Sequence, residues 1–362
     1  MSGVWAVLTS AGTESGPGGD VYALTRVCRA ARQAGQDVPV LDLTVDEQVR
    51  VFRWTGRPGE FMPWSGPLER PQAVYNRVPG RARERRVLWS HRALLGDVLV
   101  ANPHFLDKDQ FALRVSPDAG RGAWRVPNTR VAADCEDVYE LLCMERAVYL
   151  KPVSGHAGAG IIRCERRATG LQIQTQSPAG GRCARSLPSA QARLWLRSRT
   201  RSRRYVAQAE APTLRWRGRR FDLRVLVQRR PGGAWDVTGA GARVGAPGAI
   251  VTHVPNGGSI APAQAVLAEV FSGRGRQVWE HACASAVEVA ACASQGAPDW
   301  CEFTVDMGFG TGGEVYVFEA NAKPMRFDEV ALERLAKARV VEYLTWLSEK
   351  QQAEAVVPRE CP

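Results

Sequence analysis

Residues 301–326 read Cys-Glu-Phe-Thr-Val-Asp-Met-Gly-Phe-Gly-Thr-Gly-Gly-Glu-Val-Tyr-Val-Phe-Glu-Ala-Asn-Ala-Lys-Pro-Met-Arg. Two apolar runs flank a glycine-rich turn, a pattern that predicts a β-hairpin. Alternate side chains share a face of a strand, so Glu302 and Asp306 point the same way on the first arm. Glu319 and Asn321 do so on the second arm. If the register joins the two sets, three or four oxygen donors converge on a hard cation such as Mg²⁺. A solvated polar face is the other interpretation.

The composition narrows the class of protein. A chain of 362 residues with 45% hydrophobic content is expected to form two or three domains. Its apolar runs are short and its first residues show no signal-peptide core, so we expect a cytoplasmic protein without a membrane partner. The nine cysteines are scattered and include no Cys-x-x-Cys pair, which favours reduced thiols and gives a zinc site little support.

The net charge of +11 comes mainly from arginine, which is densest at residues 81–86 and 197–204. Such runs are typical of solvated helix faces or loops, and a basic surface also suits an anionic ligand. No nucleic-acid-binding motif accompanies them, so we expect no nucleic-acid partner.

The order of the predicted elements divides the chain into an α/β class fold of several units. Strands alternate with helices over residues 1–105, which predicts an N-terminal α/β domain whose last helix covers Arg83–Val100. A small α+β lobe is expected over 106–210, with a loop at Ser177–Arg182. A larger lobe is expected over 211–350, closed by a helix at Glu329–Lys350, and residues 351–362 are expected to form a frayed tail.

A second informative stretch, residues 149–162, places a strand ending in Lys151 before a loop of small residues. Gly155, Gly158 and Gly160 permit tight turns, and small side chains let backbone N–H groups approach anionic oxygens. The lysine would add a point charge to a phosphate. This is not a Walker A motif, because the lysine precedes the glycines, and a flexible hairpin loop is the alternative interpretation.

A third stretch, residues 221–228, reads Phe-Asp-Leu-Arg-Val-Leu-Val-Gln and predicts a strand with Asp222 and Arg224 on one face. Arg243 lies at the end of its expected hairpin partner. Two arginines there suit a transferring phosphate or a bound carboxylate, and a cross-strand ion pair is the alternative.

Taken in order, these motifs resemble the ATP-grasp superfamily. Four segments are similar to its YheC/YheD group, described as spore-coat-associated and related to the RimK-like carboxylate–amine ligases: residues 74–77, 221–228, 235–239 and 319–324. The resemblance covers about residues 70–330. It implies an N-terminal α/β domain and two lobes whose antiparallel sheets clasp ATP.

The resemblance also implies roles for individual residues. Arg224 and Arg243 would act near the γ-phosphate and an acyl phosphate, and Asp306, Glu319 and Asn321 would bind Mg²⁺. The loop at 154–160 would close over the phosphates, and 205–210 would be the hinge strand beside adenine. The implied ATP-binding residues are Lys108, Lys151, Ser154, Gly155, Gly158, Gly160, Gln208, Ala209, Glu210 and Asp222.

The acceptor side departs from the pattern of the relatives. RimK-like ligases often carry asparagine four residues before a Gly-Gly pair, where this chain has His253. Asn256 stands beside Gly257 and could substitute. These three residues are therefore the expected substrate-binding set.

The leading hypothesis is an ATP- and Mg²⁺-dependent ligase that joins a small-molecule or peptide carboxylate to an amine through an acyl phosphate. The alternatives are a non-catalytic nucleotide-binding protein of a spore or cell surface layer and a small-molecule kinase on the same scaffold. The resemblance leaves a homodimer open. No Ser/His/Asp nucleophile set is required, because such catalysis is mainly positioning and electrostatics.

Overall fold

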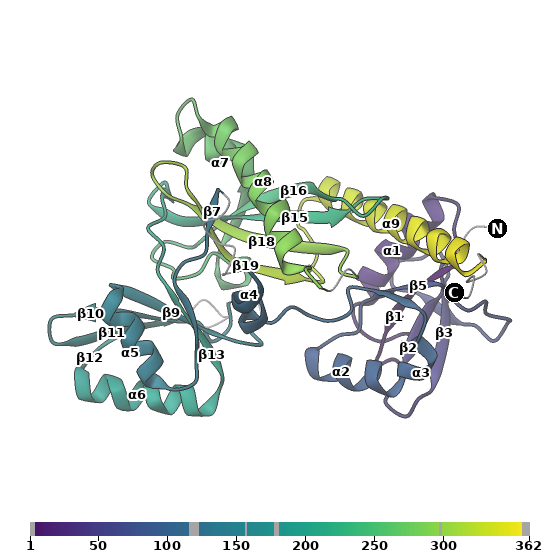
Figure 1. Cartoon of the computed structure of the whole chain (residues 1–362), viewed down its shortest axis with the longest axis horizontal. Helices are drawn as coiled ribbons and strands as arrows, with labels where there is room; N and C mark the ends of the chain where they lie inside the picture. Colours follow the sequence, from purple (N-terminus) through teal and green to yellow (C-terminus); the bar gives the residue numbers. More distant parts are fainter. Residues whose placement is uncertain (1–3, 116–122, 156–157, 177–180, 297–298, 357–362) are drawn as a thin grey trace, which may run out of the picture.

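The computed structural model describes residues 4–115, 123–155, 158–176, 181–296 and 299–356, which form three β-sheets with helices on them (Figure 1). Figure 1 shows the N-terminal sheet at one end of the molecule and the second sheet at the other. The third sheet lies between them and above. The predicted mixed α/β architecture is confirmed.

The first sheet has six strands in the order β4-β3-β2-β1-β5-β6. The strands β1, β2, β5 and β6 are parallel, whereas β3 and β4 are antiparallel additions at one edge. Asp20 caps α1, as its position before an apolar-periodic run predicts, by accepting from the Ala23 N–H at 2.9 Å. The elements are β1 (Trp5–Thr9), α1 (Val21–Gln33), β2 (Val40–Leu43), β3 (Val49–Trp54), β4 (Phe61–Pro63), β5 (Ala73–Asn76), α2 (Arg81–Ser90), α3 (Arg92–Leu95) and β6 (Leu99–Ala101).

The prediction of a helix over Arg83–Val100 was wrong at the C-terminal end of this range. The helical part stops at Leu95 before Gly96, and the last residues of the range enter the strand β6. This strand pairs in parallel with β5, and Ala101 is fully buried. A three-residue strand owes its conformation to that distant partner, so local periodicity does not reveal it.

The second sheet is antiparallel throughout, in the order β12-β11-β10-β9-β13-β8. Helices α5 and α6 pack on it through an apolar cluster that includes Leu141, Leu196 and Leu150. The elements are β8 (Thr129–Ala132), α5 (Cys135–Met144), β9 (Ala147–Pro152), β10 (Ile162–Arg167), β11 (Gly170–Gln176), β12 (Arg182–Pro188), α6 (Ser189–Ser202) and β13 (Tyr205–Ala209).

The strand β12 was not predicted. Its sequence, Arg-Cys-Ala-Arg-Ser-Leu-Pro, lacks the alternation of a half-buried strand, and in the structure nearly all of it is exposed. It forms only because its backbone pairs with β11 at the edge of the sheet. The loop predicted just before it falls mostly on residues 177–180, which lie outside the described residues.

The third sheet follows the order β17-β16-β15-β18-β19-β7, and β14 pairs with β15 as well. Its centre is the predicted hairpin, now β18 and β19. Two helices, α7 and α8, follow β17 and are separated by a short turn that contains Gly273. The elements are α4 (Lys108–Val115), β7 (Trp124–Arg125), β14 (Arg215–Trp216), β15 (Arg219–Arg229), β16 (Trp235–Val244), the 3₁₀ turn η2 (Val254–Asn256), β17 (Ser259–Pro262), α7 (Ala263–Val270), α8 (Gly275–Ala293), β18 (Glu302–Phe309) and β19 (Val315–Ala322).

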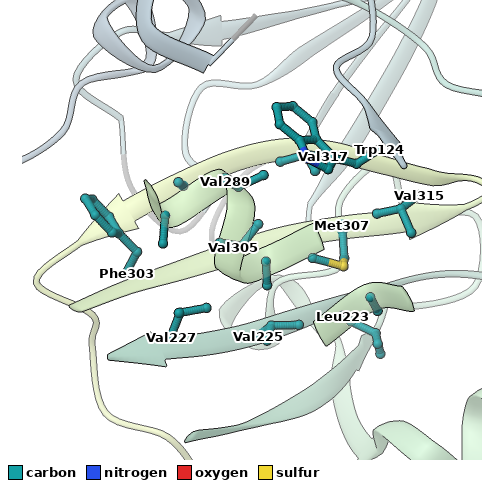
Figure 2. Packing of buried hydrophobic residues seen from close by; sticks show 14 of the residues in the cluster. Trp124, Leu223, Val225, Val227, Val289, Phe303, Val305, Met307, Val315 and Val317 are labelled. Carbon is teal, nitrogen blue, oxygen red and sulfur yellow. The ribbon is translucent and has the colours of Figure 1, made fainter. Parts of the chain in front are cut away.

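Every residue of β18 is buried, so both faces of the third sheet are covered here. The apolar positions Phe303, Val305 and Met307 join the core beneath α8, where Figure 2 shows them beside Val289. The alternate positions therefore turn the other way and carry Glu302, Thr304 and Asp306 on the opposite face. Strand alternation thus separates the core from the polar groups of the hairpin.

The terminal helix α9 (Val330–Val356) extends beyond the predicted end at Lys350 and into the segment expected to be a frayed tail. It packs on α1 and the first sheet, where Val341 and Leu344 meet Trp5 and Leu24 in one cluster. Figure 1 shows it crossing from the third sheet to the N-terminal domain. Across the described parts of the chain, no helix combines the length and the apolar character needed to cross a membrane.

We predict that Phe303→Ala lowers the free energy of unfolding by about 3–5 kcal/mol, because it leaves a cavity in a fully buried cluster. Urea unfolding monitored by circular dichroism measures the change. Leu113→Ala is the matched control, since the Leu113 side chain is 71% exposed, and its effect should stay within about 0.5 kcal/mol. Equal effects at the two positions would contradict the assignment of the core.

Candidate active site

A cleft opens between the second and third sheets. One wall comes from β9 and β13, and the other from β15, β16, β18 and β19. Charged and polar side chains gather on these walls, which include Lys151, Gln208, Glu210, Asp222, Arg243, His253, Asp306 and Glu319. The structure therefore brings into one cleft residues that lie far apart in the sequence.

The hairpin register places Asp306 directly opposite Glu319, and Thr304 opposite Asn321. The Asn321 amide donates to Glu319 at 3.0 Å. Two carboxylates and an amide are oxygen donors of the kind that Mg²⁺ takes, so this part of the predicted ligand set fits a hard cation. Within the described ranges, no group of three or more His, Cys, Asp or Glu forms a metal cluster, so any such ion would rely on the amide and on its substrate for further ligands.

Glu302 does not join this group. Its carboxylate accepts from the Tyr75 hydroxyl at 2.5 Å and from the Asn102 amide at 3.1 Å, both in the N-terminal domain. The Gln228 amide donates to its second oxygen at 3.2 Å. The fourth oxygen donor that the sequence pattern allowed is thus committed to the junction between domains.

Two arginines hold Asp306. Arg224 donates to both of its oxygens, at 2.9 and 2.8 Å, and Arg243 approaches one of them at 2.9 Å. Arg243 also donates to Asp222 at 2.7 Å, and the Thr252 hydroxyl donates to the second oxygen of Asp222. Burial alone would lower the pKa of Arg243, but Asp222 and Asp306 raise it above its usual range. The guanidinium therefore stays charged.

Two lysines face the other carboxylate. Lys108, at the start of α4, lies 3.0 Å from Glu319. Lys151 on β9 donates to Gln208 at 2.6 Å and lies 5.6 Å from the centre of the Phe318 ring. Burial lowers the pKa of Lys151 to about 8, and Lys108 adds to the shift. Burial would raise the pKa of Glu319, but the two lysines hold it well below its usual range.

The charges of the site do not cancel. Among the described residues, six cations face the four carboxylates on its walls, which leaves positive charge in excess; the cations are Lys108, Lys151, Arg163, Arg220, Arg224 and Arg243. A cleft of this kind attracts an anion, because its low-dielectric walls strengthen the field of the excess charge.

The glycine-rich loop lies between the two walls. Gly158 and Gly160 adopt φ of +73° and +75°, the left-handed region that favours glycine. A Cβ on Gly158 would lie 3.1 Å from both the His253 and the Asn256 side chains, so the loop packs closely on the acceptor residues. Ser154 is exposed and Gly155 donates to the Pro152 carbonyl at 3.1 Å. Two other residues of the loop, His156 and Ala157, lie outside the described residues.

His253 lines the cleft. Asn256 follows on the same turn and is buried, and Gly257 lies next to it in the left-handed region at φ +83°. Burial lowers the pKa of His253 to about 3, and Arg243 adds to the effect, so the imidazole is neutral at pH 7. Its Nδ1 is buried and finds no hydrogen-bond partner among the residues that the structure describes.

The predicted hinge strand is β13, but its groups are largely occupied. The Ala209 N–H donates to the Asn128 carbonyl and the Glu210 N–H to the Ala147 carbonyl, both at 2.8 Å. The Glu210 carboxylate accepts from Arg163, Arg220 and Tyr149. Ala211 follows them on the cleft wall and was missed by the sequence reasoning; over the described ranges its N–H has no hydrogen bond.

Sequence reasoning missed several other lining residues. Tyr149 stands two residues before Lys151 and Arg220 two before Asp222, so strand alternation places each on the same face as its predicted neighbour. Strand alternation did not predict the position of Phe318, because it places Phe318 on the face opposite Glu319. Phe318 is the extra residue where the pairing steps from Glu319 to Val317, and this bulge directs it into the cleft.

Solved structures share this architecture. The D-alanyl-alanine synthetase A of Vibrio cholerae superposes with a TM-score of 0.55 and 10% identity, covering 98% of this chain and 100% of that one. The D-alanine-D-alanine ligase of Coxiella burnetii gives 0.51 and 13%, covering 97% and 98%. The ATP-grasp ligase PsnB with a minimal precursor gives 0.51 and 16%, covering 96% and 99%. The chain therefore has the ATP-grasp fold.

The sequence narrows the class further. Residues 97–347 match the YheC/D-like ATP-grasp family, and the chain belongs to that family. It is 29% identical over 297 residues to the endospore coat-associated protein YheD of Bacillus subtilis, covering 77% of this chain. The matched region spans 64% of that relative's length. The resemblance of the motifs is thus confirmed at the level of fold and family.

We predict that Arg243→Met destabilises the protein by about 3–5 kcal/mol, because it leaves buried Asp222 without a cationic partner and Asp306 with Arg224 alone. Combining it with Asp222→Asn should recover part of the loss, as a double-mutant cycle in urea unfolding will show. Arg276→Met is the control, since the Arg276–Glu280 pair is exposed and should contribute less than about 1 kcal/mol. A purely additive double mutant would refute the coupling.

Proposed function

We propose that this protein is an ATP- and Mg²⁺-dependent carboxylate–amine ligase. The observation that carries the proposal is the cleft of an ATP-grasp fold in which Asp306 stands opposite Glu319, with two arginines on the first and a lysine on the second. Ligases occur among the structures that share this fold. The chemistry is inferred from the site, since fold alone does not define an activity.

On this proposal the nucleotide occupies the small-lobe side of the cleft. Lys108 and Lys151 contact its phosphates, and Ser154, Gly158 and Gly160 bring backbone N–H groups toward them. Gly155, whose N–H donates to the Pro152 carbonyl, shapes the turn of this loop. The adenine lies beside the hinge, where Gln208, Ala209 and Glu210 were predicted. The N–H of Ala211, which has no described partner, and the ring of Tyr149 on this wall support the placement, as does the ring of Phe318 on the opposite wall.

The carboxylate pair and Asn321 are the proposed ligands of the metal. When bound, Mg²⁺ would neutralise phosphate charge. Asp306 and Glu319 would then exchange their present arginine and lysine partners for the ion. Asp222 keeps Arg243 in place through their 2.7 Å contact.

The reaction we propose has two displacements. A substrate carboxylate oxygen attacks the γ-phosphorus, and ADP leaves. The amine nitrogen then attacks the acyl carbon, inorganic phosphate leaves and the nitrogen loses a proton. Arg224 and Arg243 hold the phosphoryl and acyl-phosphate oxygens, whose negative charge they stabilise.

The acceptor side is formed by His253, Asn256 and Gly257. Because the His253 imidazole is neutral and its Nδ1 has no described partner, it can accept a hydrogen bond from the incoming amine. The substrates are an amino acid or peptide, in keeping with the precursor complexed with PsnB. We further propose that the protein acts in the cytoplasm.

A second candidate function has one specific observation in its favour. The relative YheD is described as coat-associated, which fits a nucleotide-binding structural role at a spore surface layer. A Glu319→Ala protein would separate the two. Normal assembly at such a layer without any ATP turnover would favour the structural role.

We predict that the protein forms ADP and phosphate from ATP and Mg²⁺ only when a suitable amino acid or peptide is present. Hydroxylamine should trap the acyl phosphate as a hydroxamate, which a kinase product would not give. Glu319→Gln should lower the rate by at least about a hundredfold. Tight nucleotide binding without turnover on any acid in a broad panel would refute ligase activity, and a phosphorylated product without amide would favour a kinase.

We predict that metal-free ATP binds most tightly below pH 8 and loses affinity as the pH rises. The pKa of Lys151 is lowered to about 8, so its positive charge is present below that value and is lost above it. The dissociation constant should rise about tenfold between pH 7 and 9 in calorimetric titrations. Lys151→Arg should flatten this dependence, because guanidinium stays charged. A flat profile for the unmodified protein would contradict the role of Lys151.

A further inference from the structure

The outer face of the second sheet is strongly basic. Residues 182–204, which form β12, α6 and the turn after it, include eight arginines and no acidic residue. All eight are exposed: Arg182, Arg185, Arg193, Arg197, Arg199, Arg201, Arg203 and Arg204. We call this surface the α6–β12 face.

Most of these arginines form no ion pair within the described parts of the chain. Arg193 pairs with Glu136, and Arg204 lies 2.9 Å from Asp109. The six other arginines have no acidic partner in the parts of the chain that the structure describes. So many exposed and unpaired arginines on one lobe form a positive surface that is complementary to an acidic partner.

The face also offers apolar contact. Two guanidiniums lie near the Trp195 ring, that of Arg185 at 6.0 Å and that of Arg199 at 5.0 Å from its centre. The neighbouring Leu194 is 66% exposed. Basic side chains around an accessible aromatic ring are a composition typical of interfaces.

The strand β12 adds a backbone component. It is the terminal strand of its sheet, and all its residues except Leu187 are exposed. Its free edge presents N–H and C=O groups that another extended chain can pair with. Arginines at its first and fourth positions would flank such a chain.

This edge leads to the acceptor side of the cleft. At the start of β12, Arg182 donates to the Pro247 carbonyl. Beside it on β11, Gln176 accepts from the Ile250 N–H at 3.2 Å and donates to the Asn256 carbonyl at 3.1 Å. A chain that follows β12 therefore arrives at the loop that carries His253 and Asn256.

From this continuity we infer that the α6–β12 face docks an acidic polypeptide, extended along β12, which supplies a substrate group at the acceptor end. The substrate part of this inference rests on the proposed ligase function, whereas the docking part does not. A polypeptide is favoured over a nucleic acid because the open strand edge offers backbone pairing, which a nucleic acid cannot match.

Docking can be measured without nucleotide, by the fluorescence anisotropy of a labelled peptide of alternating glutamate and threonine. The double variant Arg197→Glu/Arg201→Glu should bind it at least about tenfold more weakly, because two attractions become repulsions. The matched control is Arg83→Glu/Arg86→Glu on α2, which makes the same charge change on exposed residues. Figure 1 shows α2 and α6 at opposite ends of the molecule. This control should bind like the unmodified protein.

Two further probes address the mode of docking. A peptide of alternating glutamate and proline has the same charge but lacks alternate N–H groups, so it should bind clearly more weakly if β12 pairs with the ligand. An oligouridine of equal charge should bind more weakly than the glutamate–threonine peptide at the same ionic strength. Equal binding of the proline peptide, or tighter binding of the oligouridine, would overturn the inference.

The substrate part is tested by turnover. With an acidic peptide as substrate, Arg197→Glu/Arg201→Glu should raise KM and leave kcat unchanged, because these residues lie outside the cleft. Equal KM values for this variant and the α2 control would overturn it. If the unmodified protein binds the peptide and no acid yields ADP, the ligase proposal fails while the docking result stands.

Discussion

The site depends on an ion-pair network on the polar face of one hairpin. Asp306 is held by Arg224 and Arg243, and Glu319 by Lys108. Asp306 is almost fully buried, where an unpaired charge would cost several kcal/mol. The carboxylates therefore require their cations, and the cations come from β15, β16 and α4. This requirement ties the two arms of the hairpin to the elements around them.

The hairpin is also fixed at the end nearest the N-terminal domain. Glu302 begins β18 and binds Tyr75 and Asn102, while Lys323 follows β19 and pairs with buried Glu84. Both contacts cross to the first domain. The carboxylates of the cleft thus sit between a polar anchor on one side and the core beneath α8 on the other. A hairpin held in this way can present them with little freedom, which is what an electrostatic site requires.

Much of this arrangement could be predicted from the sequence, because it follows strand alternation. Side-chain alternation and the register of paired strands are enough to predict three features. These are the hairpin, the pairing of its acidic residues and the nearness of Arg243 to Asp222. The features that sequence reasoning missed depend on pairing with another strand, on a bulge or on contacts with another domain. The strand β6 exists through its pairing with β5, and β12 through its pairing with β11. Phe318 enters the cleft through a bulge, which alternation cannot show, and Glu302 is directed to another domain.

The network also explains how a site so rich in charge can exist before its ligands arrive. Each carboxylate in the cleft already has a cation from the chain, so folding leaves none of them unpaired. On the proposed function, a nucleotide and its metal would exchange these partners: phosphate oxygens would take lysine and arginine, and the metal would take Asp306 and Glu319. Because folding has already removed water from these carboxylates, ligand binding only changes their partners. The free-energy cost of desolvating them is therefore not added again on binding. The excess of positive charge in the cleft then favours binding of an anion.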